Sequence, residues 1–149
     1  MRALTSDEAL AAGYTGSLKG HINTNFYELV EAIGEPSFDW STRGDKINYE
    51  WAVNYRGQIF YIYDWKAEPR ACKDDRNFRF NIGGQVDASA FIHALNLRLE
   101  LLQLDQDAKV ISDKLRANLT EVQESMYMRI FAHTRLRASE IRRELENVL

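Results

Sequence analysis

The sequence predicts an α+β fold: an antiparallel β-meander with an N-terminal helix packed on it, followed by a long C-terminal helical segment. Three observations lead to this prediction. Between Ile47 and Ile82, large apolar residues alternate with polar ones, which is the period of a strand with one buried face. After Asp87, apolar residues recur every three or four positions, as in a helix. From Asp105 to Leu149 there is no glycine and no proline, so nothing there forces a helix to end.

Composition and length are those of a globular domain. The chain has 149 residues, of which 45% are hydrophobic and 28% charged, and its formal net charge is −3. These values exclude global disorder and give no whole-chain electrostatic reason for binding nucleic acid. Cys72 is the only cysteine, so no intrachain disulfide can form. We find no secretory signal between Met1 and Gly20 and no membrane-spanning run, and we expect a soluble, cytoplasmic protein.

The first twenty or so residues are rich in small and polar types, and we expect an irregular lead-in with a short helical turn at Ser6–Ala12. A clearer helix follows, capped by Asn23 or Thr24 and ended by Gly34 with Pro36 after it. Its predicted apolar face consists of Phe26, Leu29, Val30 and Ile33.

Three strands are predicted in series. The first, from Ile47 to Tyr55, places its large apolar residues on one face, and Arg56-Gly57 makes a turn. The second, from Gln58 to Trp65, is apolar on both faces, which indicates an interior strand. The third, from Phe78 to Ile82, follows an exposed loop. We expect Gly83-Gly84 to end it in a tight turn with positive φ, and a backbone anion site is the alternative. Short connections favour an antiparallel meander.

The helical segment is either a hairpin, with Asn118 capping a helix that starts at Leu119, or one continuous helix. Thirty helical residues span about 45 Å, more than the small sheet can cover. We therefore predict a sheet domain over residues 1–84 and a helical segment over 85–149 that mediates self-association into a homo-oligomer. The stripe expected to be buried consists of Leu119, Val122, Met126, Ile130, His133, Arg137, Ile141, Leu145 and Val148.

No catalytic constellation is apparent. His21, His93 and His133 are far apart, and no pair has metal-ligand spacing. We therefore predict no metal, no cofactor and no enzymatic activity. The alternative is a small enzyme acting on a nucleotide, with Asp64, Lys66 or His21 as acid–base groups.

Aromatic and basic residues gather on and around the second predicted strand. Aromatic rings beside Arg and Lys can stack a planar base and neutralise a phosphate, although most of these rings could simply form the sheet core. We expect function at the strand end, Asp64-Trp65-Lys66. The candidate ligand-binding residues are Trp51, Tyr63, Asp64, Trp65, Lys66 and Arg79.

An arginine-rich stretch occupies the last part of the chain. A basic helix face can hold the phosphates of nucleic acid, but interleaved glutamates favour a salt-bridged outer face or a helix–helix seam. Nucleic-acid binding is therefore possible but not favoured. The arginines are Arg129, Arg135, Arg137, Arg142 and Arg143.

Five short motifs lie in the first half of the chain: Thr15-Gly-Ser-Leu-Lys-Gly20, Leu29 to Gly34-Glu-Pro36, Glu50-Trp51, Ile62-Tyr-Asp-Trp-Lys66 and Ile82-Gly-Gly84. Together they resemble small proteins encoded by bacteriophages and prophages. The resemblance implies an accessory protein of anti-CRISPR or anti-signalling type that inhibits a host defence system by binding a host protein or a nucleotide signal in the host cytosol. The Thoeris anti-defence sponges, which pair a sheet with C-terminal helices and sequester a cyclic nucleotide-like signal in an oligomer, are one such group.

Overall fold

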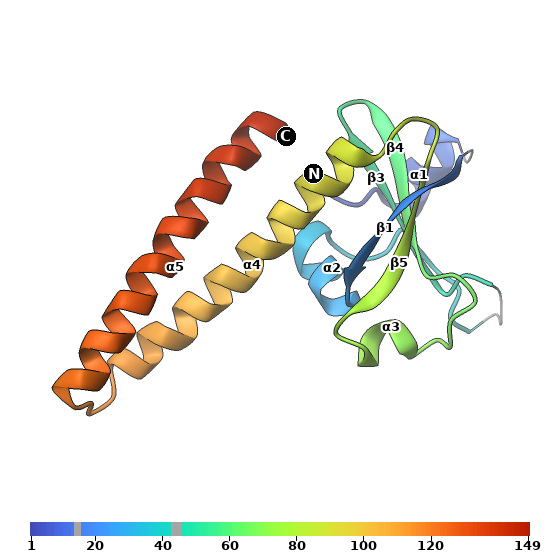
Figure 1. Cartoon of the computed structure of the whole chain (residues 1–149). Coiled ribbons are helices and arrows are strands. Elements are labelled where there is room, and N and C mark those ends of the chain that lie inside the picture. The colour runs from blue at the N-terminus through green and yellow to red at the C-terminus, as the bar shows by residue number, and fades with distance from the viewer. Residues whose placement is uncertain (14–15, 43–45) are drawn as a thin grey trace. The chain divides into compact units, whose positions relative to one another are not determined.

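The computed structural model describes residues 1–13, 16–42 and 46–149. They form two compact units, residues 1–96 with Leu149 and residues 97–148 (Figure 1). Thr15, which begins the first of the five motifs, lies outside the described residues. The α+β class predicted from the sequence is confirmed.

A five-stranded antiparallel sheet forms the centre of the first unit, in the order β1-β5-β4-β3-β2. The middle strands β3, β4 and β5 are the predicted meander, and β4 is interior, as its two apolar faces indicated. Arg56 and Gly57, with φ of 54° and 78°, make the two-residue turn between β3 and β4. The strands are β1 (Ser17–Thr24), β2 (Phe38–Asp39), β3 (Tyr49–Tyr55), β4 (Gln58–Tyr63) and β5 (Phe78–Gly84).

The first strand corrects the prediction of an irregular lead-in. Ser17–Thr24 pairs with β5 at the edge of the sheet. It lacks an alternation of large apolar residues because a helix side chain fills the space beside it: a Cβ on Gly20 would lie 2.6 Å from Cδ1 of Ile92. The helical turn expected at Ser6–Ala12 is present as α1, with Thr5 and Glu8 forming a capping box at its start.

Gly83 and Gly84 require a second correction, because neither forms the expected turn with positive φ. Both belong to β5, and at Gly84 the absence of a side chain allows close packing. A Cβ on Gly84 would lie 3.0 Å from Cδ1 of the Phe60 ring, and one on Gly16 would lie 2.9 Å from backbone atoms of Gly84. Strands and rings therefore approach each other more closely than a side chain would allow.

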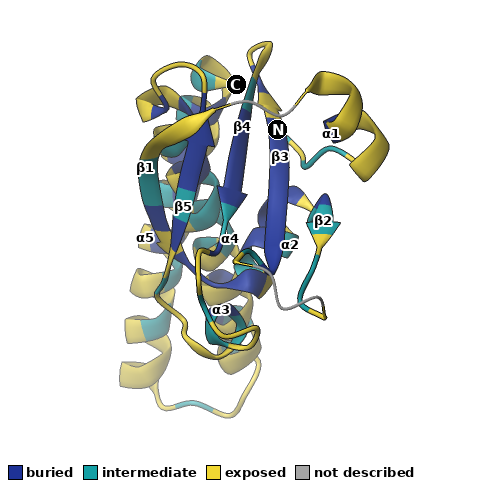
Figure 2. Cartoon of the chain, turned by 90° about the vertical axis from the view of Figure 1, so that its right-hand side faces the viewer, coloured by how far each residue is buried: buried dark blue, intermediate teal, exposed yellow. Residues whose placement is uncertain are grey.

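One face of the sheet is covered by α2 (Phe26–Ile33) and by the first turns of α4 (Ser89–Leu115). The ring centroids of Phe26 and Trp51 lie 5.5 Å apart, and Phe60 stacks on Phe91 at 4.6 Å. Figure 2 shows the strands beneath as largely buried. The expected helix packed on the sheet is thus confirmed, although Asn25, and not Asn23 or Thr24, caps it by accepting a hydrogen bond from the backbone N–H of Glu28.

The opposite face is only partly covered. Helix α1 places Ala9 against Ala52 and Tyr61, and the Tyr61 hydroxyl donates to the Gly13 carbonyl at 2.7 Å. Between β4 and β5, where the sequence predicted an exposed loop, a short helix α3 (Ala71–Asp74) lies beside α2, with Lys73 Nζ 4.4 Å from the Phe26 ring centroid, and buries Cys72 completely. The part of this face nearest the end of β4 carries the candidate site.

The second unit is a hairpin formed by α4 from Leu97 onward and by α5 (Glu121–Val148). Thr120, and not Asn118, caps α5: its hydroxyl accepts from the Gln123 N–H, and the Gln123 side chain accepts from the Thr120 N–H. One set of buried and half-buried positions on each helix follows a heptad repeat, as in an antiparallel coiled coil. They are Leu97, Leu101, Leu104, Ala108, Ile111 and Leu115 on α4, and Tyr127, Phe131, Thr134, Ala138, Ile141, Leu145 and Val148 on α5.

This seam differs from the stripe that the sequence predicted. Only the last three members of that stripe, Ile141, Leu145 and Val148, belong to it. Val122 and Met126 are 81% and 47% exposed. The predicted stripe steps repeatedly by four residues, so it moves around the helix, whereas a heptad seam averages 3.5 residues per turn. None of the described helices is both long and apolar enough to cross a membrane.

Candidate functional site

Trp65 is 47% exposed just beyond the end of β4, and it lies between two hollows in the surface. One, of about 320 Å³, is lined by Trp40, Lys46, Ile47 and Trp65. The other, of about 260 Å³, is lined by Gly16, Ser17, Ile47, Tyr61, Tyr63, Trp65 and Gly83. We call the group formed by Trp40, Lys46, Ile47, Tyr63, Trp65 and Lys66 the Trp65 surface.

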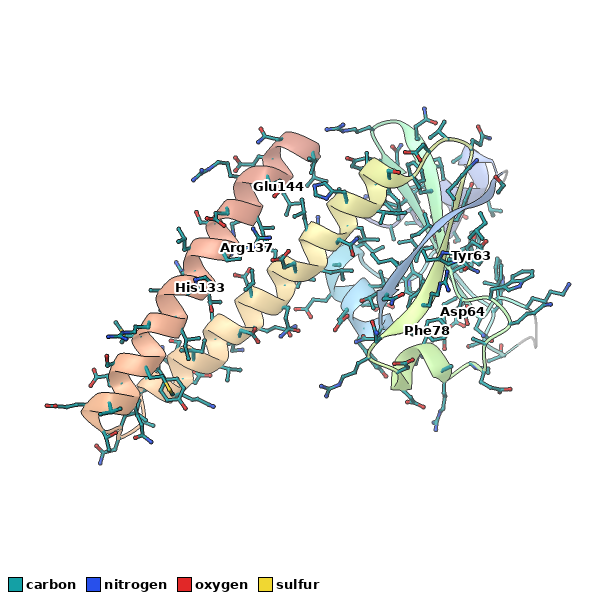
Figure 3. The ribbon with its side chains drawn as sticks, in the orientation of Figure 1. Tyr63, Asp64, Phe78, His133, Arg137 and Glu144 are labelled. Carbon is teal, nitrogen blue, oxygen red and sulfur yellow. The ribbon has the colours of Figure 1, made fainter. Side chains whose placement is uncertain are left out.

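Hydrogen bonds of Asp64 hold the backbone beneath this surface. The fully buried carboxylate accepts from the backbone N–H groups of Asn48 and Tyr49, both at 2.8 Å, and from the Asn48 side-chain amide at 2.6 Å. The Lys66 N–H donates to the Lys46 carbonyl at 2.6 Å. These bonds tie the segment before β3 to the segment after β4. Tyr63 and Asp64 are labelled where β4 ends in Figure 3.

Two cations flank the Trp65 ring. The Nζ atoms of Lys46 and Lys66 each lie 5.8 Å from the ring centroid, within the range of a cation–π contact. Lys66 has φ of 53°, a left-handed conformation that is uncommon for residues other than glycine and often marks functional positions. The Tyr63 ring stands edge-on to Trp65, with centroids 6.4 Å apart. The surface therefore combines an aromatic platform with two positive charges.

A buried acid lies behind the tyrosines. Glu50 is fully buried and is the β3 partner of Tyr63 in the sheet. Burial, together with the negative charge of Glu50, raises the pKa of Tyr61 and of Tyr63 above the usual value for tyrosine. Both phenols therefore keep their protons at neutral pH. A protonated Tyr63 can offer a ligand both a hydrogen-bond donor and an acceptor.

Arg79 lies on the same sheet face, on the neighbouring strand. Tyr63 pairs with Asn81, and Asn81 pairs with His21, so these residues form one row across β4, β5 and β1. Arg79 is two residues from Asn81, and its Nη2 lies 3.0 Å from Nδ1 of His21. Arg79 and His21 thus extend the open face beyond the Trp65 surface.

Of the six residues predicted to bind a ligand, the structure brings Tyr63, Trp65 and Lys66 together, and Arg79 shares their face. Trp51 and Asp64 are both fully buried. The Trp51 ring lies under α2 and donates its N–H to the Gly34 carbonyl at 2.9 Å. In this arrangement both buried side chains support the fold and are not accessible to a ligand.

Sequence reasoning missed Trp40, Lys46 and Ile47, which come from the segment before β3. Ile47 was assigned to a strand, but β3 begins at Tyr49. Trp40 stacks on Phe38 with centroids 5.1 Å apart and remains half-buried. One signal was available: Trp40 is one of only three tryptophans, and its immediate neighbours, Asp39 and Ser41, are polar.

The arginine-rich stretch takes part in packing between the hairpin helices. Arg137 Nε lies 2.9 Å from a Glu100 carboxylate oxygen, and Arg142 Nη2 lies 2.6 Å from Asp105. Arg137 is labelled on α5 in Figure 3. These ion pairs join α5 to α4, the helix–helix arrangement that the interleaved charges favoured.

The described residues show neither a metal site nor a reactive cysteine. Among the described residues, no group of three or more His, Cys, Asp or Glu side chains is placed to hold a metal ion. Burial raises the pKa of the Cys72 thiol to about 12, so that thiol is protonated at neutral pH and is a poor nucleophile.

No family model, curated protein or solved structure matches the chain. The resemblance to phage-encoded proteins therefore stays a prediction. Function is inferred from that resemblance and from the geometry of the Trp65 surface.

Proposed function

We propose that this chain is a non-catalytic binding protein whose Trp65 surface holds a planar anionic ligand, namely a nucleotide. The observation that carries the proposal is the half-exposed Trp65 ring with the Lys46 and Lys66 ammonium groups each 5.8 Å from its centroid. Stacking of a base on an aromatic side chain contributes about 1–3 kcal/mol. A phosphate beside the ring would meet two positive charges.

The size of the two hollows supports a small ligand. The one beside Trp40 measures about 320 Å³, at the lower end of the range for small-molecule sites. Trp40 and Trp65 supply aromatic surface there, and Tyr63 supplies a hydroxyl on the other side of Trp65. A single nucleotide, or a cyclic nucleotide that lies across Trp65, fits this arrangement better than a long polymer.

The biological role proposed for this binding is inhibition of a host defence system by a phage-encoded protein in the host cytoplasm. Sequestering a nucleotide signal would silence the defence without consuming the signal. The motifs between Gly16 and Gly84 support the phage origin. Binding without turnover is supported by Asp64, whose carboxylate is engaged in three hydrogen bonds inside the protein and is not available for acid–base chemistry.

Isothermal titration against a panel of cyclic nucleotides and adenosine–ribose signals tests the proposal. We expect the parent protein to bind at least one of them and Trp65→Ala to bind it about 5- to 100-fold more weakly, because the stacking platform is lost. Tyr27→Ala is the matched control, since Tyr27 is a 62% exposed aromatic residue on α2, and it should bind as the parent does.

The two lysines provide a second test. Lys46→Gln and Lys66→Gln should each weaken binding several-fold and reduce its dependence on salt, because each removes one screened charge. Lys109→Gln, at an exposed position of α4, should change neither property. Chromatography of the recovered ligand should show it intact. Turnover would favour the enzyme alternative, and no binding to any panel member would leave a host defence protein as the ligand of this surface.

A further inference from the structure

An apolar strip runs along the first turns of α5, outside the hairpin seam. Val122, Met126 and Ile130 follow one another at intervals of four residues and are 81%, 47% and 45% exposed. The strip forms part of a shallow surface hollow. All residues that line the hollow come from α5: Glu121, Val122, Ser125, Met126, Arg129 and Ile130. The strip therefore lies beside the seam and outside the contact with α4, and covering it would remove apolar surface from water.

The charged residues beside the strip are placed so that two antiparallel copies of α5 would bring opposite charges together. Glu121 and Arg129 lie four residues before and after Ser125, and Val122 and Ile130 lie four residues before and after Met126. In the part of the chain that the structure describes, Glu121 and Arg129 form no ion pair of their own. When the direction of the helix is reversed, the three apolar positions coincide with apolar positions, and the position of Glu121 coincides with that of Arg129.

That pattern is what a two-fold contact between identical helices requires, because the same patch must fit itself in the opposite direction. An antiparallel second α5 would set Glu121 of each copy opposite Arg129 of the other and Val122 opposite Ile130, with Met126 meeting its own counterpart. A parallel arrangement would oppose like charges. We propose that two copies of this chain associate through this strip, about an axis that passes near Ser125 and Met126.

The inference names a surface for the self-association expected of the C-terminal helices and does not depend on the Trp65 surface. Two hairpins joined in this way would form a four-helix assembly, a common solution for exposed apolar helix faces. Each bound chain would then carry one Trp65 surface, so the assembly would present two.

Size-exclusion chromatography with light scattering on the full chain tests the proposal. We expect the parent to have twice the 17.3 kDa mass of one chain and Met126→Glu to be monomeric with unchanged helical circular dichroism. Met128→Glu is the matched control: Met128 is 53% exposed but points about 200° away around the helix, and its variant should stay dimeric. A monomeric parent, or dissociation by Met128→Glu and not by Met126→Glu, overturns the proposal.

A charge exchange tests the antiparallel register. Glu121→Arg and Arg129→Glu should each raise the dissociation constant of the dimer about 10-fold, because two attractive pairs per dimer become repulsive. The double variant should restore the constant of the parent, since both pairs re-form with their signs exchanged. A double variant as weak as the single ones would show that these residues do not face each other and would overturn the register.

Discussion

The sheet unit and the hairpin bury their apolar residues in different ways. Trp51, Phe80 and Phe91 are all fully buried, and they come from three different elements, β3, β5 and α4. In the hairpin, each seam position packs on one other helix, and small or polar residues such as Ala108, Thr134 and Ala138 are among the buried ones. A large side chain in the sheet unit therefore holds several elements together, whereas a seam residue in the hairpin joins two.

The two tryptophans Trp51 and Trp65 should give the largest difference. Trp51→Ala empties a fully buried site and should lower the free energy of unfolding by about 4 kcal/mol. Trp65→Ala removes a half-exposed ring and should lower it by about 1 kcal/mol. Urea titration followed by circular dichroism measures both values. Equal losses would mean that Trp65 is as much a core residue as Trp51, and the binding proposal would lose its platform.

Asp64 should produce the next largest effect. Asp64→Ala leaves the N–H groups of Asn48 and Tyr49 without their carboxylate acceptor inside the protein, which should cost about 3 kcal/mol. Asp74→Ala, at an exposed position of α3, should change stability by less than about 0.5 kcal/mol. Urea titration of both variants checks this. A small effect of Asp64→Ala would show that the carboxylate does not hold the strand ends together.

The contrast also shows where sequence reasoning succeeds. The meander and the helical character of the C-terminal segment follow from local periodicity, because Tyr49–Tyr55 alternates with period two and the segment repeats every three or four residues. Periodicity alone left a hairpin and one continuous helix as alternatives for that segment. The burial of the Asp64 side chain could also have been predicted from the sequence. In an extended strand Asp64 lies on the same face as Phe60 and Ile62, which is buried, whereas Trp65 lies on the face of Tyr63.

Other features depend on contacts that no local pattern records. β1 was missed because Gly20 leaves its space to Ile92, a helix residue far along the chain. The hairpin seam was misplaced for a different reason: Tyr127, Thr134 and Ala138 carry less apolar character than Met126 and Ile130, so the prediction followed the apolar residues and not the heptad spacing that places these three inward. Trp40 joins the candidate site only because the chain folds back beside Trp65.

The hairpin should respond less strongly than the sheet. Ile141→Ala should lower the free energy of unfolding by about 2 kcal/mol, the lower end for such a change, because the seam is covered by one helix only. Leu136→Ala, at a 60% exposed position on the same helix, should have little effect. Hydrogen exchange should show that Ile141→Ala speeds exchange mainly in α4 and α5. Equal acceleration in β3 and β4 would mean that the two units unfold as one.

The smallest effect is expected at the edge of the sheet unit, where Arg2 Nη2 lies 2.6 Å from a Glu8 carboxylate oxygen. The Arg2 hydrogen bonds, with that from the Thr5 N–H, lower the pKa of Glu8 from 4.5 to about 2. Because the folded-state pKa is depressed, the ionised carboxylate stabilises the fold above about pH 4.5, and this stabilisation is lost as the pH falls toward 2.

Glu8→Gln keeps a capping side chain but removes the charge. Urea titrations should therefore show the parent slightly more stable than Glu8→Gln at pH 7, with the difference shrinking at pH 3 and in high salt. A difference that is constant with pH would mean that the cap, and not the charge, stabilises α1.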